Sequence, residues 1–280
     1  MNDPQHLLFA PNLTGRLHVG NAMVLWLVAR EAKERGIPFI IRLDDRYELA
    51  ERKSEEKEWE TQHTLNSALK LLEIQPLRVI WYSQRQERYL KVAGRLLAAG
   101  LVRELKPGTI DLYDANYIED LIHGRIRTYS SNIVRAGEAY STLAQAVDLW
   151  EFNVPLVIDG NELQNDCVAD LHVWDLIARS YRTTGEARPK TALVPMIADA
   201  NGNVLHKSKG PNDLYDFERW ATNYNTTADI RQALERLILK DGTSFSWDNV
   251  RAVQQIDVSP MGEQVRVHDF FELGPFCRHD

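Results

Sequence analysis

A single histidine stands two residues before a glycine in the stretch FAPNLTGRLHVGNA, residues 9–22. A turn that leads from a strand into a helix presents unpaired N–H groups and partial positive charge, which together favour a phosphate group. Gly15 and Gly20 let the backbone approach a ligand, and the imidazole of His18 can donate to a phosphate oxygen. Taken alone, LHVG fits a strand-to-helix turn with a surface histidine equally well, since the GxGxxG and P-loop patterns are absent.

The sequence around this stretch alternates between strand-like and helix-like segments. We expect strands at 7–10, 37–43, 79–82, 154–158 and 192–197, and helices at 19–35, 52–72, 84–99 and 169–181. Gly36 and Gly100 follow two of these helices, where glycine commonly ends a helix. The alternation predicts βαβ units and a parallel sheet. Ligands of such sheets bind at the carboxyl ends of the strands.

The rhythm divides the chain into four parts. Residues 1–100 and 138–210 are predicted to form the two halves of an α/β catalytic domain of Rossmann type. Residues 101–137 interrupt the alternation and are interpreted as an insertion, and residues 211–280 as a short, mainly helical C-terminal tail.

Composition limits the classes of function. The formal charge of −7 argues against a protein that nucleic acid wraps broadly, although a local basic groove stays possible. No apolar run reaches the roughly 18 residues of a membrane span. Cys167 and Cys277 fit no metal-ligand spacing, so neither a disulfide framework nor a metal site is expected. These features favour a cytoplasmic protein.

Five stretches, in order along the chain, carry a more specific signal. They are FAPNLTGRLHVGNA, FIIRLDDRYELAER, YSQRQERY, LVIDGNEL and LVPMIADANGNVLHKS. The first resembles FAPSPTGxLHxGxA, with residues 18–21 at the place of a HIGH motif, and the others resemble FxLRIEDTDRERS, YYQSERxxxY, HVIRGEDL and HLPLILGPDGKKLSKR. Together they resemble the catalytic domain of the class I glutamyl- and glutaminyl-tRNA synthetases.

The resemblance implies a ligase that uses ATP and Mg²⁺ to form an aminoacyl-adenylate. It places ATP next to the start of the helix at 19–35. The residues expected to bind ATP are Thr14, Gly15, His18, Gly20, Asn21, Glu162 and Lys207.

The ungapped match of the last stretch places residues 204–208 on the family's KMSKS loop, whose lysine meets the ATP phosphates. Lys207 takes the second lysine position and is expected to be catalytic with His18. Val204 replaces the first lysine, and Lys209 is a candidate substitute for its charge. Outside this register, the same residues would read as a solvated loop.

The amino-acid pocket departs from the family pattern. Two arginines that face the substrate glutamate in the family are replaced here by Leu8 and Asp159. A carboxylate beside Asp159 would be repelled, so the expected substrate is not glutamate unless Arg16, Arg42 or Arg46 turns into the pocket. Asp159 can alternatively be a solvated turn residue before Gly160. The remaining residues expected to bind the amino acid are Asn12, Asp44, Tyr140 and Ser141.

The acceptor of the aminoacyl group is left open between a tRNA end, a modified tRNA base and a small amine. Related truncated enzymes often carry zinc on cysteines of the insertion, but Arg103 and Glu104 stand near that place here and no zinc is expected. The alternative function is that of a non-catalytic relative that binds an amino acid or RNA in a regulatory role, which Val204 and His206 favour slightly.

Overall fold

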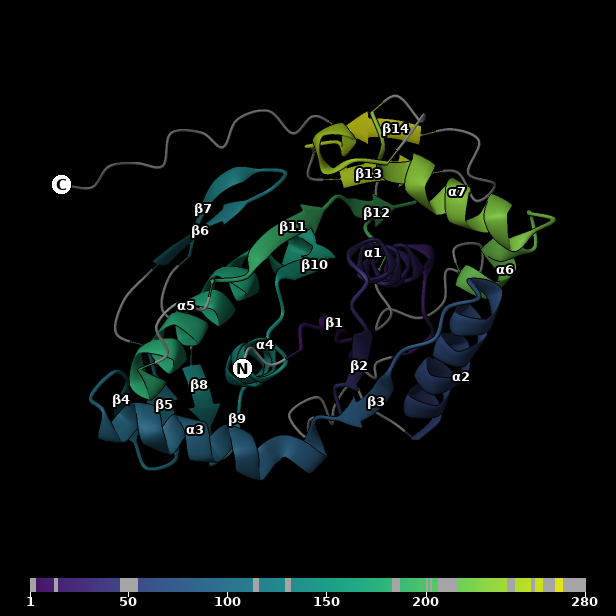
Figure 1. Cartoon of the computed structure of the whole chain (residues 1–280). Coiled ribbons are helices and arrows are strands. Elements are labelled where there is room, and N and C mark those ends of the chain that lie inside the picture. Colours follow the sequence, from purple (N-terminus) through teal and green to yellow (C-terminus); the bar gives the residue numbers. More distant parts are fainter. Residues whose placement is uncertain are drawn as a thin grey trace.

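The fold is described from a computed structural model that covers residues 4–12, 15–45, 55–112, 116–128, 132–182, 187–199, 201, 203–205, 216–240, 245–252, 255–258 and 265–268. It is an α/β structure built around parallel strands, as the sequence predicts (Figure 1). Strands β1 (Leu7–Phe9), β2 (Phe39–Leu43) and β3 (Arg78–Trp81) pair in parallel in that order. Strands β10 (Leu156–Gly160) and β11 (Lys190–Val194) form a second parallel pair, with β10 in contact with β1.

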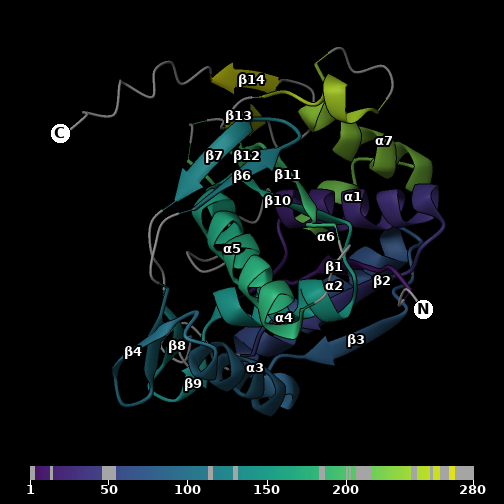
Figure 2. The same ribbon diagram turned by 60° about the vertical axis from the view of Figure 1, so that its left-hand side comes forward.

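Helix α1 (Val19–Arg35) lies at the centre and packs against strands of both parallel pairs (Figures 1 and 2). Most of its residues are buried because it contacts β1, β2, β10 and β12 (Met196–Ala198) at once. Gly36 ends the helix in the left-handed region, with φ of +66°, as its place in the sequence predicts.

The other helices of the catalytic region surround the parallel strands. Helix α2 (Glu55–Leu71) follows β2, and α3 (Gln86–Ala98) follows β3 after the short helix η2 (Ser83–Arg85). Helices α4 (Ser141–Glu151) and α5 (Gln164–Tyr181) pack against each other, and η3 (Asn161–Leu163) joins β10 to α5. Helix α4 was not anticipated, and α5 begins five residues before the predicted start.

Between α3 and α4 the chain forms short strands in place of βαβ units. Strands β4 (Arg103–Lys106), β5 (Thr109–Asp111), β8 (Asn132–Arg135) and β9 (Glu138–Ala139) make an antiparallel sheet. The hairpin of β6 (Asn116–Asp120) and β7 (Gly124–Thr128) joins the edge of β11. The antiparallel sheet lies apart from the parallel strands in Figure 2.

The C-terminal part begins with α6 (Phe217–Ala221) and α7 (Thr227–Ile238), which pack on α2 and α1. After the short helix η6 (Trp247–Asn249), β13 (Gln255–Val258) pairs in parallel with β12, and β14 (Val265–His268) pairs with β13. The sequence predicted helices here but not this extension of the sheet. No helix in the described part of the chain is long and apolar enough to cross a membrane.

We expect Gly36→Ala to lower the free energy of unfolding by about 1–2 kcal/mol, because an alanine is strained in the left-handed region. Gly94→Ala should raise it by about 0.5–1 kcal/mol, because Gly94 lies inside α3 and loses more conformational freedom on folding than alanine. An added Cβ meets nothing within 4 Å at either position, so backbone conformation alone separates the two variants. Urea denaturation of both measures the difference, and two changes of the same sign would contradict it.

Candidate active site

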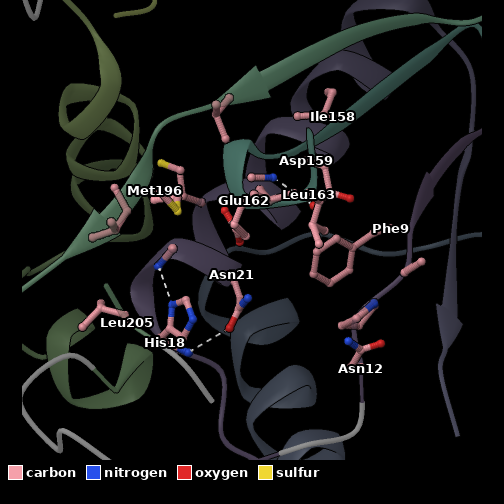
Figure 3. A pocket seen from close by; sticks show the side chains of 18 of the residues that line it. Phe9, Asn12, His18, Asn21, Ile158, Asp159, Glu162, Leu163, Met196 and Leu205 are labelled. Atoms are coloured by element: carbon pink, nitrogen blue, oxygen red, sulfur yellow. Dashed lines mark hydrogen bonds between the residues drawn. The ribbon is translucent and has the colours of Figure 1, made fainter. Parts of the chain in front are cut away.

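A cleft of about 360 Å³ opens at the carboxyl ends of β1, β10 and β11, beside the N-terminus of α1 (Figure 3). Its walls come from the segment after β1, the first turn of α1, α4, the β10–η3 junction, β12 and residues 204–205. This is where ligands of open α/β sheets bind. None of the described residues that line it is a lysine or an arginine. Two acidic residues, Asp159 and Glu162, line it.

His18 is the N-cap of α1 and stands at one side of the cleft. Its Nδ1 accepts a hydrogen bond from the backbone N–H of Gly20 (3.2 Å). The backbone N–H of His18 donates to Oδ1 of Asn21 (3.3 Å). An accepting Nδ1 carries no proton, so in the neutral ring the proton lies on Nε2, which is then a donor. A Cβ at position 20 would lie 3.1 Å from the imidazole, so Gly20 also leaves room for this ring.

The segment between β1 and α1 is held from behind by α2. The N–H of Gly15 donates to Oγ1 of Thr61 (3.1 Å), which in turn donates to the carbonyl of Gly15 (2.6 Å). The N–H of Leu17 donates to Oγ1 of Thr64 (3.0 Å). Both threonines are buried, so the backbone before His18 is fixed by groups that lie outside the cleft.

Glu162 follows β10 and turns back over Gly160. A Cβ on Gly160 would clash with the carboxyl group of Glu162, so the side chain of Glu162 can take this position only above a glycine. The side chain is exposed to the cleft, yet the surrounding protein removes enough water to raise the pKa of Glu162. A raised pKa favours the neutral carboxyl group, which can donate as well as accept a hydrogen bond.

Asp159 lies at the opposite side of the cleft from His18 (Figure 3). Its Oδ1 accepts a hydrogen bond from the N–H of Gly160 (2.9 Å), the contact expected of a turn residue. The side chain is nevertheless half-buried and lines the cleft together with Leu8 and Asn12. The two interpretations of Asp159 given by the sequence therefore describe two properties of one residue.

Two of the three arginines that the sequence offered as substitutes are already paired. Arg42 is buried and its Nη1 lies 2.8 Å from Oδ2 of Asp148. Arg16 forms ion pairs with Asp216 (2.7 Å) and Glu218 (2.8 Å). Arg46 lies outside the described residues.

Seven of the eleven predicted site residues that the structure describes line the cleft. Those that line the cleft are Leu8, Asn12, His18, Gly20, Asn21, Asp159 and Glu162. Those that the structure places outside the lining are Gly15, Asp44, Tyr140 and Ser141. Thr14, Lys207 and Lys209 lie outside the described residues.

The predicted residues outside the lining are still close to it in the chain or in the sheet. Asp44 follows β2, where its backbone pairs with that of Asn12, and its side chain is 2% exposed. Tyr140 is the N-cap of α4, and Ser141 is the first residue of that helix.

The segment that carries Lys207 and Lys209 begins and ends beside the cleft. Before it, Val204 pairs with Ala198, the N–H of Leu205 donates to the carbonyl of Ile197 (3.0 Å), and both 204 and 205 line the cleft. After it, Asp216 pairs with the backbone of His18. The turn before Val204 is tied by Asp199, which accepts from the N–H groups of Asn201 and Asn203 (2.9 Å each).

Gln145 and Met196 are among the lining residues that sequence reasoning did not assign to the site. Gln145 faces the cleft from α4, one helical turn after Ser141, and Met196 faces it from β12. The i, i+4 spacing from Ser141 would have pointed to Gln145 if α4 had been recognised.

Part of the sequence that forms this cleft is similar to a known family. Residues 6–103 match the family described as tRNA synthetases class I (E and Q), catalytic domain. A glutamate–tRNA ligase of Xanthomonas campestris is 26% identical over an alignment that covers 97% of this chain and 65% of the relative. One of Xylella fastidiosa is 27% identical and is covered over 52% of its length. Over these residues the chain is similar in sequence to the class I synthetases for glutamate and glutamine.

Two solved structures have a fold similar to that of this chain. Glutamate–tRNA synthetase from Elizabethkingia anophelis superposes with a TM-score of 0.66 at 15% identity, over 93% of this chain and 69% of that one. A glutamate–tRNA ligase from Elizabethkingia meningosepticum, solved in complex with its amino acid, gives the same TM-score at 14% identity. The chain spans between half and two thirds of the length of the curated relatives above.

The cap at His18 generates a stability prediction. We expect His18→Ala to lower the free energy of unfolding by about 1 kcal/mol, because the first turn of α1 loses its acceptor. His18→Asn should cost only a few tenths of a kcal/mol, because asparagine is among the best N-cap residues. Urea denaturation checks both values, and equal losses in the two variants would show that the imidazole does not act as a cap.

Proposed function

We propose that the chain is an ATP-dependent ligase that activates an amino acid other than glutamate as its adenylate and transfers it to an acceptor. The amino-acid carboxylate attacks the α-phosphorus of ATP, an aminoacyl-adenylate forms, and pyrophosphate leaves. The single observation that carries the proposal is the capped start of α1, where a donor on His18 and the helix N-terminus face one cleft. The family relationship, which is strongest over this same part of the chain, supports the proposal.

The ATP end of the cleft fits a phosphate donor in two ways. The N-terminus of α1 and Nε2 of His18 supply hydrogen-bond donors and partial positive charge. The residues that precede the segment with Lys207, Val204 and Leu205, line the cleft, and Asp216 after it pairs with the backbone of His18. These flanking positions support the proposal that a lysine of the segment contacts the phosphates. No group of three metal-ligating side chains occurs among the residues the structure describes. Mg²⁺ would therefore arrive mainly on the ATP phosphates, where it neutralises their charge.

The amino-acid end carries the argument against glutamate. Leu8, Asn12, Gln145 and Asp159 offer one aliphatic group, two amides and one carboxylate, and no described residue of the lining is a lysine or an arginine. A second carboxylate would be placed near Asp159 without a cation to balance it, which costs several kcal/mol in order of magnitude. The acceptor stays open between tRNA and a small amine, since the chain matches only part of its relatives' length.

The exchange of labelled pyrophosphate into ATP, run with each of the common amino acids, tests the function. We expect exchange with one or a few amino acids, and about 10²-fold slower exchange in both His18→Asn and Lys207→Ala, since each removes one transition-state contact to phosphate. Lys209→Ala is the matched control for Lys207→Ala. A normal rate in Lys207→Ala with a collapse in Lys209→Ala would show that the register of the lysine segment is wrong by two residues.

One observation favours a second function. Val204 lines the cleft. In the register suggested by the sequence resemblance it replaces the first lysine of the family's loop, so the proposed phosphate end would have one charge fewer. A non-catalytic relative that binds an amino acid or RNA would tolerate this loss. If no amino acid supports pyrophosphate exchange but one of them binds saturably, the regulatory function is supported.

Substrate choice is tested at Asp159. We expect wild type to reject glutamate and to prefer a side chain that donates to this carboxylate, a contact worth about 1.5–3 kcal/mol, or roughly ten- to hundredfold in kcat/KM. Asp159→Arg should gain activity with glutamate and lose the native substrate. If wild type activates glutamate well and Asp159→Arg does so equally well, Asp159 does not exclude glutamate from the pocket.

A further inference from the structure

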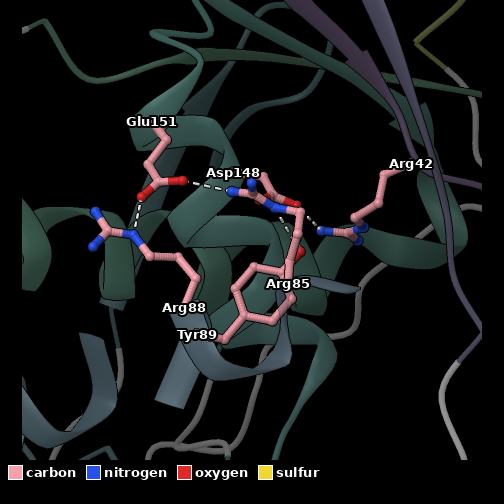
Figure 4. A network of polar contacts seen from close by, with 6 residues as sticks. All are labelled: Arg42, Arg85, Arg88, Tyr89, Asp148 and Glu151. Carbon is pink, nitrogen blue, oxygen red and sulfur yellow. Dashed lines mark hydrogen bonds and ion pairs between the residues drawn. The ribbon is translucent and has the colours of Figure 1, made fainter. Parts of the chain in front are cut away.

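A buried carboxylate that the proposed mechanism does not use lies behind the cleft. Asp148 on α4 is fully buried and is surrounded by donors from β2, η2 and α3 (Figure 4). Its Oδ2 accepts from Nη1 of Arg42 (2.8 Å) and from the hydroxyl of Tyr89 (2.9 Å). Its Oδ1 accepts from Nε of Arg85 (2.8 Å). A carboxylate with this many charged donors is stable in the core only while they stay in place.

The network extends outward and carries a surplus of positive charge. Glu151, one turn further along α4, pairs with both Arg85 and Arg88. Three guanidinium groups therefore meet two carboxylates. Burial alone would lower the pKa of Arg42, but its interactions with Asp148 above all, and also with Tyr89 and Asp44, outweigh burial and raise that pKa. Asp44, which directly follows β2, supplies a third negative charge two residues along the chain from Arg42.

The same network ties together two elements that reach the amino-acid end of the cleft. On β2, Arg42 precedes Asp44, whose backbone pairs with that of Asn12. On α4, Asp148 follows Gln145 by three residues, so both lie on one side of the helix. Asn12 and Gln145 line the cleft. The contact between Arg42 and Asp148 therefore bridges the two elements directly behind these lining residues.

We propose that Asp148 is a positioning residue for the amino-acid end of the cleft: by holding Arg42, it fixes the separation of β2 and α4 and keeps a cation beside Asp44. The inference rests on the proposed function, because it concerns how the same cleft recognises its amino acid. The phosphate end is fixed separately, by His18 and by Thr61 and Thr64 of α2. Loss of Asp148 should therefore weaken binding of the amino acid and leave binding of ATP unchanged.

The test is the pyrophosphate exchange assay with KM measured separately for the amino acid and for ATP. We expect Asp148→Asn to raise KM for the amino acid about tenfold or more, with KM for ATP within about twofold, since small displacements of binding groups have effects of this size. Arg88→Gln is the matched control, because Arg88 joins the network only through Glu151 and is 37% exposed. It should leave both KM values unchanged.

Asp148→Asn leaves Arg42 buried without its main partner and can fail to fold, which circular dichroism detects. Tyr89→Phe then decides, because it removes one donor to Asp148 and no charge. We expect a KM for the amino acid about threefold higher and an unchanged KM for ATP. Equal changes in both KM values, or values equal to those of Arg88→Gln, would overturn the positioning role while leaving the proposed function intact. A wild type that activates no amino acid would overturn the proposed function and this inference with it.

Discussion

The junction between β1 and α1 has to satisfy its backbone polar groups without filling the cleft in front of it. The first N–H groups of a helix have no partner within the helix. Here His18 accepts one of them through Nδ1, while Thr61 and Thr64 of α2 satisfy the backbone of the preceding segment. The cap thereby assigns the ring proton to Nε2. A structural requirement of the helix and the donor needed for a phosphate are met by the same imidazole.

The electrostatics of the cleft follow from where the arginines are held. Arg42 and Arg16 are paired with carboxylates outside the lining, and among the described lining residues there are two carboxylic acids but no lysine or arginine. Arg42 lies on β2, the neighbour of β1, and pairs in the core with Asp148, from an element far along the chain. The charge of the substrate pocket is therefore decided by contacts behind it as much as by the residues that face it.

Local sequence was sufficient for the features that depend on near neighbours. The end of α1 at Gly36 rests on residues within one turn, and the parallel pairing of β1 and β2 follows from the strand–helix–strand order. The N-cap role of His18 was not predicted. Helix α4 was missed: polar residues such as Gln145 and Asp148 are interspersed with apolar ones, and none of its residues is exposed, so it has no solvent-facing polar side. Without α4, neither Gln145 in the cleft nor Asp148 behind it could be predicted. Strands β13 and β14 were missed because their stability comes from pairing with β12, which the local sequence does not reveal.

The two ends of the cleft also differ in how much of the chain contributes to them. The proposed phosphate end takes His18 and Gly20 from one continuous stretch, to which the proposal adds Glu162 and the segment with Lys207 from later in the chain. The amino-acid end draws Leu8 and Asn12 from the segment at β1, Gln145 from α4 and Asp159 from β10, and their spacing is set by contacts such as that of Arg42 with Asp148. Exchanging one of these side chains changes the charge that the pocket presents without disturbing the cap of α1. A fold arranged in this way can keep one reaction while it changes the amino acid on which the reaction is performed.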